Sequence, residues 1–115
     1  MQADCIFCNI VNGKIPAKVV YEDQQIFAFH DISPAAPVHV LVIPKKHIAN
    51  LLDVTIDDNQ VIAHLMMSIP QIATQLGLAE KGFRIVINTK DDGGQTVDHL
   101  HAHILGGRFM TWPPG

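Results

Sequence analysis

The order of apolar and polar residues along the chain predicts five strands. Residues 19–21, 26–30 and 83–87 are short runs rich in β-branched and aromatic side chains, and residues 38–43 are almost continuously β-branched. Turn-forming residues bound these runs, as is typical of strands, and the continuous run predicts a central one. Residues 99–105 alternate histidine with apolar residues, and this period of two predicts a fifth strand that ends at Gly106 and Gly107.

Two other stretches repeat their apolar residues at three- and four-residue steps, which predicts helices. A short helix is expected over residues 5–11, with Asn12 and Gly13 at its C-terminal end. A long helix is expected over residues 55–76, where Thr55 and Asp58 resemble a capping box. Pro70 lies inside the long helix and lacks a backbone N–H, so we expect the helix to bend there.

The connections between successive strands are mostly too short for the crossovers that parallel strands need. The sequence therefore predicts the α+β class, with a five-stranded antiparallel sheet, one long helix and one or more short helices. The length of 115 residues and the apolar fraction of 48% favour a single domain over residues 1–115.

The net charge of −3 provides no basic surface for nucleic acid or for an anionic membrane. No apolar run reaches the ~18 residues of a membrane-spanning helix. The start of the chain is not typical of a signal peptide, so we expect a cytoplasmic location.

The histidine strand places His99, His101 and His103 on one face, with neighbouring rings about 6.6 Å apart. Three interpretations fit this pattern. The histidines could bind a metal, or one could act as a nucleophile while the others bind oxyanions or move protons, or they could have no chemical role.

Two further motifs lie near the predicted site. Before the strand, residues 92–96 combine two glycines with Gln95 and Thr96, a composition that suits anion binding by backbone N–H groups but also an ordinary turn. Near the start of the chain, Cys5 and Cys8 form a Cys-x-x-Cys pair, which could be half of a zinc site, a redox pair or two free thiols.

Several motifs, in order, resemble the histidine triad superfamily and its branch of histidine triad nucleotide-binding proteins. They are His-x-His-x-His at residues 99–103 preceded by Gly-Gly-Gln at 93–95, Phe-His-Asp-Ile-Ser-Pro at 29–34, Ala-Pro-Val-His at 36–39, Ile-Pro-Lys-Lys-His at 43–47, and the terminal Trp-Pro-Pro-Gly at 112–115. The resemblance extends over residues 6–115.

This resemblance implies a five-stranded antiparallel sheet that pairs with a second copy into a ten-stranded sheet. It implies hydrolysis of purine nucleoside 5′-phosphoramidates, such as adenosine 5′-phosphoramidate and lysine-linked AMP, through a nucleotidyl-histidine on His101. Two alternatives stay open: a nucleotide-binding regulatory protein with incidental hydrolysis, and a dinucleoside-polyphosphate hydrolase. The implied partners are a purine nucleoside monophosphate or its phosphoramidate and a second copy of the chain, with no organic cofactor.

The resemblance also implies roles for individual residues. His103 would contact the phosphate, His99 would orient the site, His39 would hold or relay protons, and the Thr96 hydroxyl would assist the leaving amine. Asp31 would bind the ribose hydroxyls, although the residues alone favour a turn cap at this position. The other implied nucleotide contacts are Asn88, Gly94 and Gln95 at the phosphate and Ile6, Phe7, Ile10, Phe29, Ile32 and Leu41 around the base.

Some relatives use two cysteines and two histidines as zinc ligands, which here implies a structural zinc on Cys5, Cys8, His47 and His99. The chain departs from the family pattern at two positions. Thr96 stands where serine is common, and Asp98 stands where tyrosine or a similar residue is common. A carboxylate at Asp98 could raise the pKa of a neighbouring imidazole.

Overall fold

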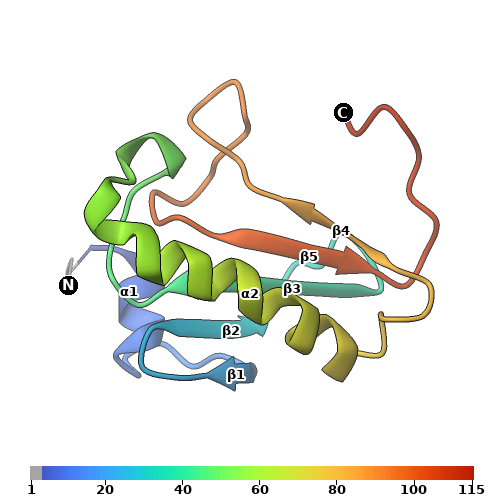
Figure 1. Ribbon diagram of the computed structural model, residues 1–115, viewed down its shortest axis with the longest axis horizontal. Helices are drawn as coiled ribbons and strands as arrows, with labels where there is room; N and C mark the ends of the chain where they lie inside the picture. The colour runs from blue at the N-terminus through green and yellow to red at the C-terminus, as the bar shows by residue number, and fades with distance from the viewer. Residues whose placement is uncertain (1–3) are drawn as a thin grey trace.

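The computed structural model describes residues 4–115, and residues 1–3 lie outside the described part. Its centre is one five-stranded antiparallel sheet with the order β1-β2-β3-β5-β4 (Figure 1). The strands are β1 Val19–Glu22, β2 Ile26–His30, β3 Val38–Pro44, β4 Phe83–Val86 and β5 Ala102–Gly106. The predicted α+β class is confirmed, and the β-branched run is the central strand.

Both predicted helices are present, as α1 Ile6–Val11 and α2 Asn59–Gln75. The capping box of Thr55 and Asp58 forms, but it caps the N-terminus of a short 3-10 turn, Ile56–Asp58, and not that of α2 itself. This turn leads directly into α2. A second 3-10 turn, Leu51–Asp53, precedes it, and α2 continues through Pro70. Within residues 4–115, no helix has the length and apolar character needed to cross a membrane.

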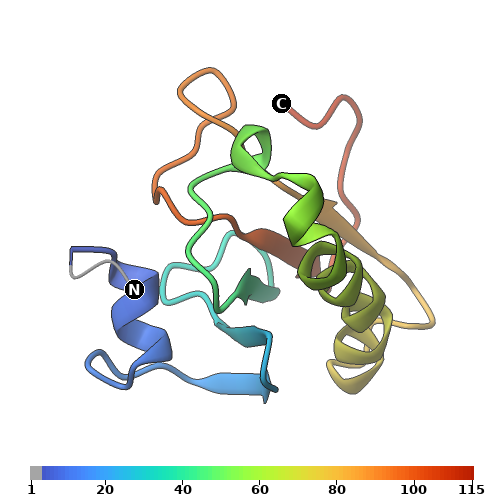
Figure 2. The same ribbon diagram turned by 60° about the vertical axis from the view of Figure 1, so that its left-hand side comes forward.

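The alternation of side chains along the strands gives the sheet two different faces. Helix α2 covers one face, where Ala28, Val40 and Ile104 form part of the main core. Helix α1 lies on the opposite side (Figure 2) and packs against a smaller cluster that includes Phe29 and Leu41. His39 and His103 belong to this second face, because His103 pairs across the sheet with Leu41.

The histidine strand is shorter than predicted. Strand β5 begins at Ala102, so His99 and His101 lie before it. The reason lies in the neighbouring strand, because β3 ends at Pro44, which has no N–H to donate to a continuing ladder. The Pro44 carbonyl instead accepts a hydrogen bond from His99 Nε2 at 2.8 Å, and the Leu100 N–H bonds to the Ile48 carbonyl at 2.7 Å.

A hydrogen-bonded carboxylate joins α2 to the turn between β1 and β2. Asp23 Oδ2 accepts from Tyr21 Oη at 2.8 Å and from His64 Nε2 at 2.6 Å, and Asp23 Oδ1 accepts the N–H groups of Gln25 and Ile26. Burial acts to raise the pKa of Asp23, but these hydrogen bonds outweigh it and hold the pKa well below its usual range.

We predict that Asp23→Asn lowers the free energy of unfolding by about 1–2 kcal/mol at pH 7, since the single amide oxygen cannot replace both carboxylate oxygens and two of the four donors lose their acceptor. A carboxyl group with a lowered folded-state pKa stabilises the fold above its unfolded pKa of about 4 and loses that contribution as the pH falls further. The difference between variant and wild type, measured by urea unfolding, should therefore narrow from pH 7 to pH 3. Asp92→Asn in an exposed loop is the control, and a gap independent of pH would contradict the prediction.

Candidate functional site

Four histidines from three parts of the chain meet on the sheet face that α2 leaves free. His39 Nε2 on β3 lies 2.8 Å from His103 Nδ1 on β5. The ring centroids of His101 and His103 are 4.9 Å apart. Phe7 of α1 packs edge-on against both His99 and His101, with centroid distances of 5.9 and 5.1 Å. The structure thus brings together the three triad residues and the fourth histidine singled out in the sequence.

A main-chain carbonyl determines the tautomer of His101. His101 Nδ1 lies 2.7 Å from the carbonyl oxygen of His99. A carbonyl oxygen can only accept a hydrogen bond, so Nδ1 carries the proton. In the neutral ring Nε2 then holds the lone pair, which is the form in which imidazole acts as a nucleophile or base.

A main-chain N–H determines the tautomers of the other two rings. The Ala35 N–H donates to His39 Nδ1 at 2.9 Å, so Nδ1 holds the lone pair and the neutral ring carries its proton on Nε2. This proton points to His103 Nδ1, which accepts it. Neutral His103 therefore carries its own proton on Nε2 and can donate it to an oxyanion.

Burial lowers the pKa of the triad histidines. It is the main cause that brings the pKa of His103 to about 4, with smaller effects from His101 and His39, and it also lowers the pKa of His101. Both rings are therefore neutral near pH 7. The sequence left open whether Asp98 raises the pKa of a neighbouring imidazole. The structure shows no such effect on the triad, because Asp98 is exposed and the pKa of each triad ring falls.

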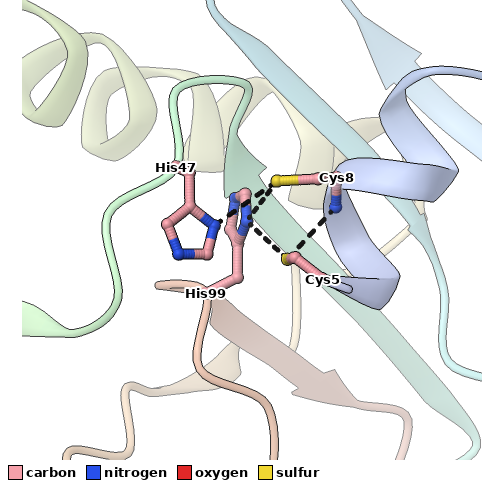
Figure 3. Close-up of side chains that lie close together, drawn as sticks. All are labelled: Cys5, Cys8, His47 and His99. Atoms are coloured by element: carbon pink, nitrogen blue, oxygen red, sulfur yellow. Dashed lines mark hydrogen bonds between the residues drawn. The ribbon is translucent and has the colours of Figure 1, made fainter. Parts of the chain in front are cut away.

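Two cysteines and two histidines form a second cluster beside the triad. Figure 3 shows Cys5 and Cys8 at the start of α1, His47 after β3 and His99 before β5, with all four side chains directed toward one another. Cys5 Sγ lies 3.4 Å from His99 Nδ1, and Cys8 Sγ lies 3.4 Å from His47 Nδ1 and 3.5 Å from His99 Nδ1. All four ligand atoms lie within 4.8 Å of one another.

The Cys5–Cys8–His47–His99 cluster has the dimensions of a tetrahedral metal site. With metal–sulfur distances of about 2.3 Å and metal–nitrogen distances of about 2.05 Å, tetrahedral ligands lie about 3.6 Å apart, close to the spacing observed. His99 donates its Nε2–H to the Pro44 carbonyl, so its Nδ1 lone pair faces the two sulfurs. Burial raises the pKa of the Cys5 thiol, whereas reactive cysteines have a lowered pKa, which argues against a redox pair.

A second group, Asp31, His39 and His103, also places three metal-ligating atoms within 4.8 Å. Its surroundings do not suit a metal. A metal on His39 Nε2 would require a proton on Nδ1, and that proton would meet the N–H of Ala35. The two clusters therefore differ in function: the cysteine-containing one can hold a metal, and this one suits a hydrogen-bond relay.

A cavity of about 620 Å³ opens beside His39 and Asp31. Asp31 Oδ1 accepts the Ser33 N–H at 2.7 Å, as a turn cap does, while Oδ2 lies 3.5 Å from His39 Nε2. Ile32 is 98% exposed. The sequence did not single out most of the other residues that line this cavity, which are Pro16, Ala17, Lys18, His30, Pro34 and Pro37.

The residues expected around a purine base are mostly buried together. Phe7, Ile10, Phe29 and Leu41 are each at most 9% exposed and fill the space between α1 and the sheet. The rings of Phe7 and Phe29 meet edge to face at 5.5 Å. Ile6 lies outside this cluster and is 47% exposed. The cluster forms an apolar wall behind His101, and Phe7 connects it directly to the triad.

The glycines of the loop over residues 88–98 are required by its shape. Gly94 has φ +76°, and a Cβ at Gly93 would lie 2.5 Å from the Thr89 carbonyl oxygen. Asn88 Nδ2 donates to the Gly93 carbonyl at 2.6 Å, so this amide holds the loop closed.

Gln95 performs a similar structural task. Its Nε2 donates to the carbonyls of Ala49 and Val97, at 2.8 and 3.0 Å, and its Oε1 accepts the Lys90 N–H at 2.9 Å. Both amide hydrogens are thus engaged within the protein. Thr96 is exposed and lines a hollow of about 400 Å³ together with Cys5 and His47.

Some residues that shape the site gave no signal in the sequence. The Ala35 N–H and the Pro44 carbonyl select imidazole tautomers through main-chain atoms. Every residue carries such groups, so only their position in the fold distinguishes them.

Comparison with known proteins places the chain in a family. Residues 12–110 match the family model described as the HIT domain. An uncharacterised HIT-like protein of Synechococcus elongatus is 54% identical over 115 residues, which is the whole of both chains.

Solved structures give the same result. A HIT family hydrolase from Legionella pneumophila is 53% identical with a TM-score of 0.95, and the alignment covers 97% of this chain and 100% of that one. A histidine triad nucleotide-binding protein from Candida albicans is 30% identical with a TM-score of 0.83, over 96% of this chain and 83% of that one.

Proposed function

The chain belongs to the HIT family, and from this premise we propose that it hydrolyses purine nucleoside 5′-phosphoramidates with His101 as the nucleophile. The observation that carries the proposal is the hydrogen bond from His101 Nδ1–H to the His99 carbonyl, which leaves the Nε2 lone pair free. A neutral imidazole held in one orientation is suited to attack an electrophilic phosphorus.

The reaction proposed has two steps. His101 Nε2 forms a bond to the α-phosphorus while the bond from phosphorus to the amine breaks, and the amine leaves with a proton donated at the site. Water then attacks phosphorus, the phosphorus–Nε2 bond breaks, and a nucleoside monophosphate is released. Thr96, whose hydroxyl lies in the neighbouring loop, is the proposed aid to the leaving amine.

The remaining contacts follow from donors and acceptors near the triad. His103 Nε2–H would donate to a phosphate oxygen, since its Nδ1 already accepts from His39. Asp31 Oδ2, on the wall of the 620 Å³ cavity, would accept from the ribose hydroxyls. The base would lie against the apolar wall of Phe7, Ile10, Phe29 and Leu41, beside Ile32. Asn88, Gly94 and Gln95 are the remaining proposed phosphate contacts. The Gly94 and Gln95 N–H groups donate to the carbonyls of Asp91 and Lys90 within the loop, so binding a phosphate through them would require this loop to rearrange.

We also propose that Cys5, Cys8, His47 and His99 hold a structural zinc ion. The donor set, the spacing of the ligand atoms and the Pro44 carbonyl on His99 Nε2 support this assignment. Zinc there would supply a cross-link between α1, the end of β3 and the segment before β5. By holding His99 in place, the zinc ion would also fix the position of the His99 carbonyl, which accepts from His101 Nδ1.

A homodimer is the proposed assembly, with two β4 strands pairing into a ten-stranded sheet. Strand β4 is at an edge of the sheet (Figure 1), and open edges readily pair. Arg84 on β4 donates to the Thr111 carbonyl at 2.9 Å, which holds the tail and its 82% exposed Trp112 near this edge. The proposed location is the cytoplasm.

We predict that His101→Gly lowers kcat on adenosine 5′-phosphoramidate by roughly a thousandfold or more, since it removes the nucleophile. Added imidazole should restore part of the rate, and quenched wild-type reactions should contain a nucleotidyl adduct on His101 by mass spectrometry. His64→Gln, on the other side of the sheet, is the control. Equal turnover by His101→Gly and wild type, or faster wild-type turnover of a dinucleoside polyphosphate, would refute the proposal.

For the metal, we predict about one zinc per chain in protein purified without chelator, because one tetrahedral cluster is available. Cys8→Ser should lose the metal and unfold more readily, because it removes a ligand and loosens α1. Asp31→Asn should keep the full metal content, since the relay cluster does not suit a metal. Elemental analysis measures the zinc content of each variant. A wild-type protein without metal and with two free thiols would contradict the assignment.

For the dimer, we predict that Phe83→Lys weakens association at least about tenfold, because it brings two like charges to the paired edges. Val19→Lys on β1, at the opposite edge of the sheet, is the matched control and should leave association unchanged. Sedimentation equilibrium at micromolar concentration provides the measurement. A wild-type monomer, or equal weakening by both variants, would count against pairing through β4.

A further inference from the structure

Residues 107 and 108, which follow β5, contact the loop over residues 31–37. The Arg108 guanidinium donates to the Ala35 carbonyl at 3.2 Å and to the Phe109 carbonyl at 3.2 Å. Gly107 has φ +90°, and a Cβ there would lie 2.8 Å from Pro37 Cβ. Arg108 therefore holds the loop at Ala35, and the backbone of Gly107 passes close to Pro37.

Ala35 connects Arg108 to the histidine pair of His39 and His103. Its carbonyl accepts from Arg108, while its N–H donates to His39 Nδ1 at 2.9 Å. Arg108 itself is exposed and contacts neither histidine of the relay in the bonds described. Any influence of Arg108 on the relay must therefore pass through the position of Ala35.

We propose that Arg108 is a positioning residue that maintains the tautomers of His39 and His103 by holding Ala35 in place. With the Ala35 N–H on Nδ1, His39 keeps its proton on Nε2 and donates it to His103 Nδ1. His103 then keeps an N–H at Nε2. The catalytic consequence rests on the proposed function, whereas the tautomers are a property of the free protein.

Without the Ala35 N–H, the relay could reverse. A proton on His39 Nδ1 would leave a lone pair on Nε2, and His103 would then donate from Nδ1 and present a lone pair at Nε2. A lone pair at that position repels a phosphate oxygen. The carboxylate of Asp31, 3.5 Å from His39 Nε2, favours the observed tautomer, and the neighbouring ring of His101 is neutral at the pH of the test.

The test is imidazole ¹⁵N NMR at pH 8 on the ligand-free protein, which reports which ring nitrogen carries the proton. Wild type should show His39 and His103 protonated at Nε2. Arg108→Gln should shift a measurable fraction of both rings to Nδ1–H, because the Gln amide nitrogen ends two bonds short of the guanidinium nitrogen that donates to Ala35. Arg108→Lys, whose ammonium extends further and can donate to Ala35, should keep the wild-type pattern. Ala35→Pro removes the N–H itself and should give the same shift as Arg108→Gln.

Arg84→Gln is the matched control, because Arg84 also donates to carbonyls of the tail but does not touch the loop over residues 31–37. With a phosphoramidate substrate, Arg108→Gln should lower kcat about fivefold, the effect of roughly one hydrogen bond, with a smaller change in KM.

Unchanged tautomers in Arg108→Gln, whatever Ala35→Pro shows, or an equal shift in Arg84→Gln, would overturn the role of Arg108. Tautomers that shift as expected in a protein that does not turn over phosphoramidates would support the role of Arg108 and refute the proposed function instead.

Discussion

The site depends on the hydrogen bond between His101 Nδ1–H and the carbonyl of His99. It selects one tautomer and one orientation of a ring that is only 4% exposed. The carbonyl can do this because His99 is itself held from two sides: its Nε2–H bonds to Pro44, and its Nδ1 faces two cysteines. The side chain and the main-chain carbonyl of His99 thus join the Cys5–Cys8–His47–His99 cluster to the triad.

One face of the sheet carries the main apolar core, and the other face carries the histidines of the candidate site. On the α2 side, apolar side chains of successive strands pack into the larger of the two apolar cores. On the α1 side the same strands place His39 and His103 next to apolar residues such as Leu41, and α1 packs against the apolar part of this face. His39 and His103 are therefore positioned by paired strands of the sheet, and a site that relies on orientation requires such positioning.

Main-chain donors and acceptors distinguish two clusters that look alike in composition. Both contain two histidines together with side chains that can bind metals. The Pro44 carbonyl accepts from Nε2 of His99, so Nδ1 of His99 keeps a lone pair that can bind a metal. The Ala35 N–H donates to Nδ1 of His39, so Nε2 of His39 carries the proton and acts as a donor. Metal binding and proton relay can therefore coexist a few residues apart without competing for the same atoms.

Most of the fold was predictable from the sequence, because strands and helices follow local periodicity and capping. The hairpin, the central strand over residues 38–44, the long helix and the end of α1 at Asn12 all lie where those patterns indicate. The identity of the triad and the Cys-x-x-Cys pair was also evident, since these side chains carry their chemistry wherever they lie. The start of β5 at Ala102 was not predictable, because it depends on Pro44, which is distant in sequence.

The sequence by itself thus determined the elements, the sheet and the set of reactive side chains. Only the tertiary structure decided which nitrogen of each imidazole holds a proton, and that the Gln95 side chain is occupied in holding its own loop. The physical reason is that periodicity reports which face a side chain occupies, whereas hydrogen bonds to main-chain groups depend on where a distant part of the backbone lies.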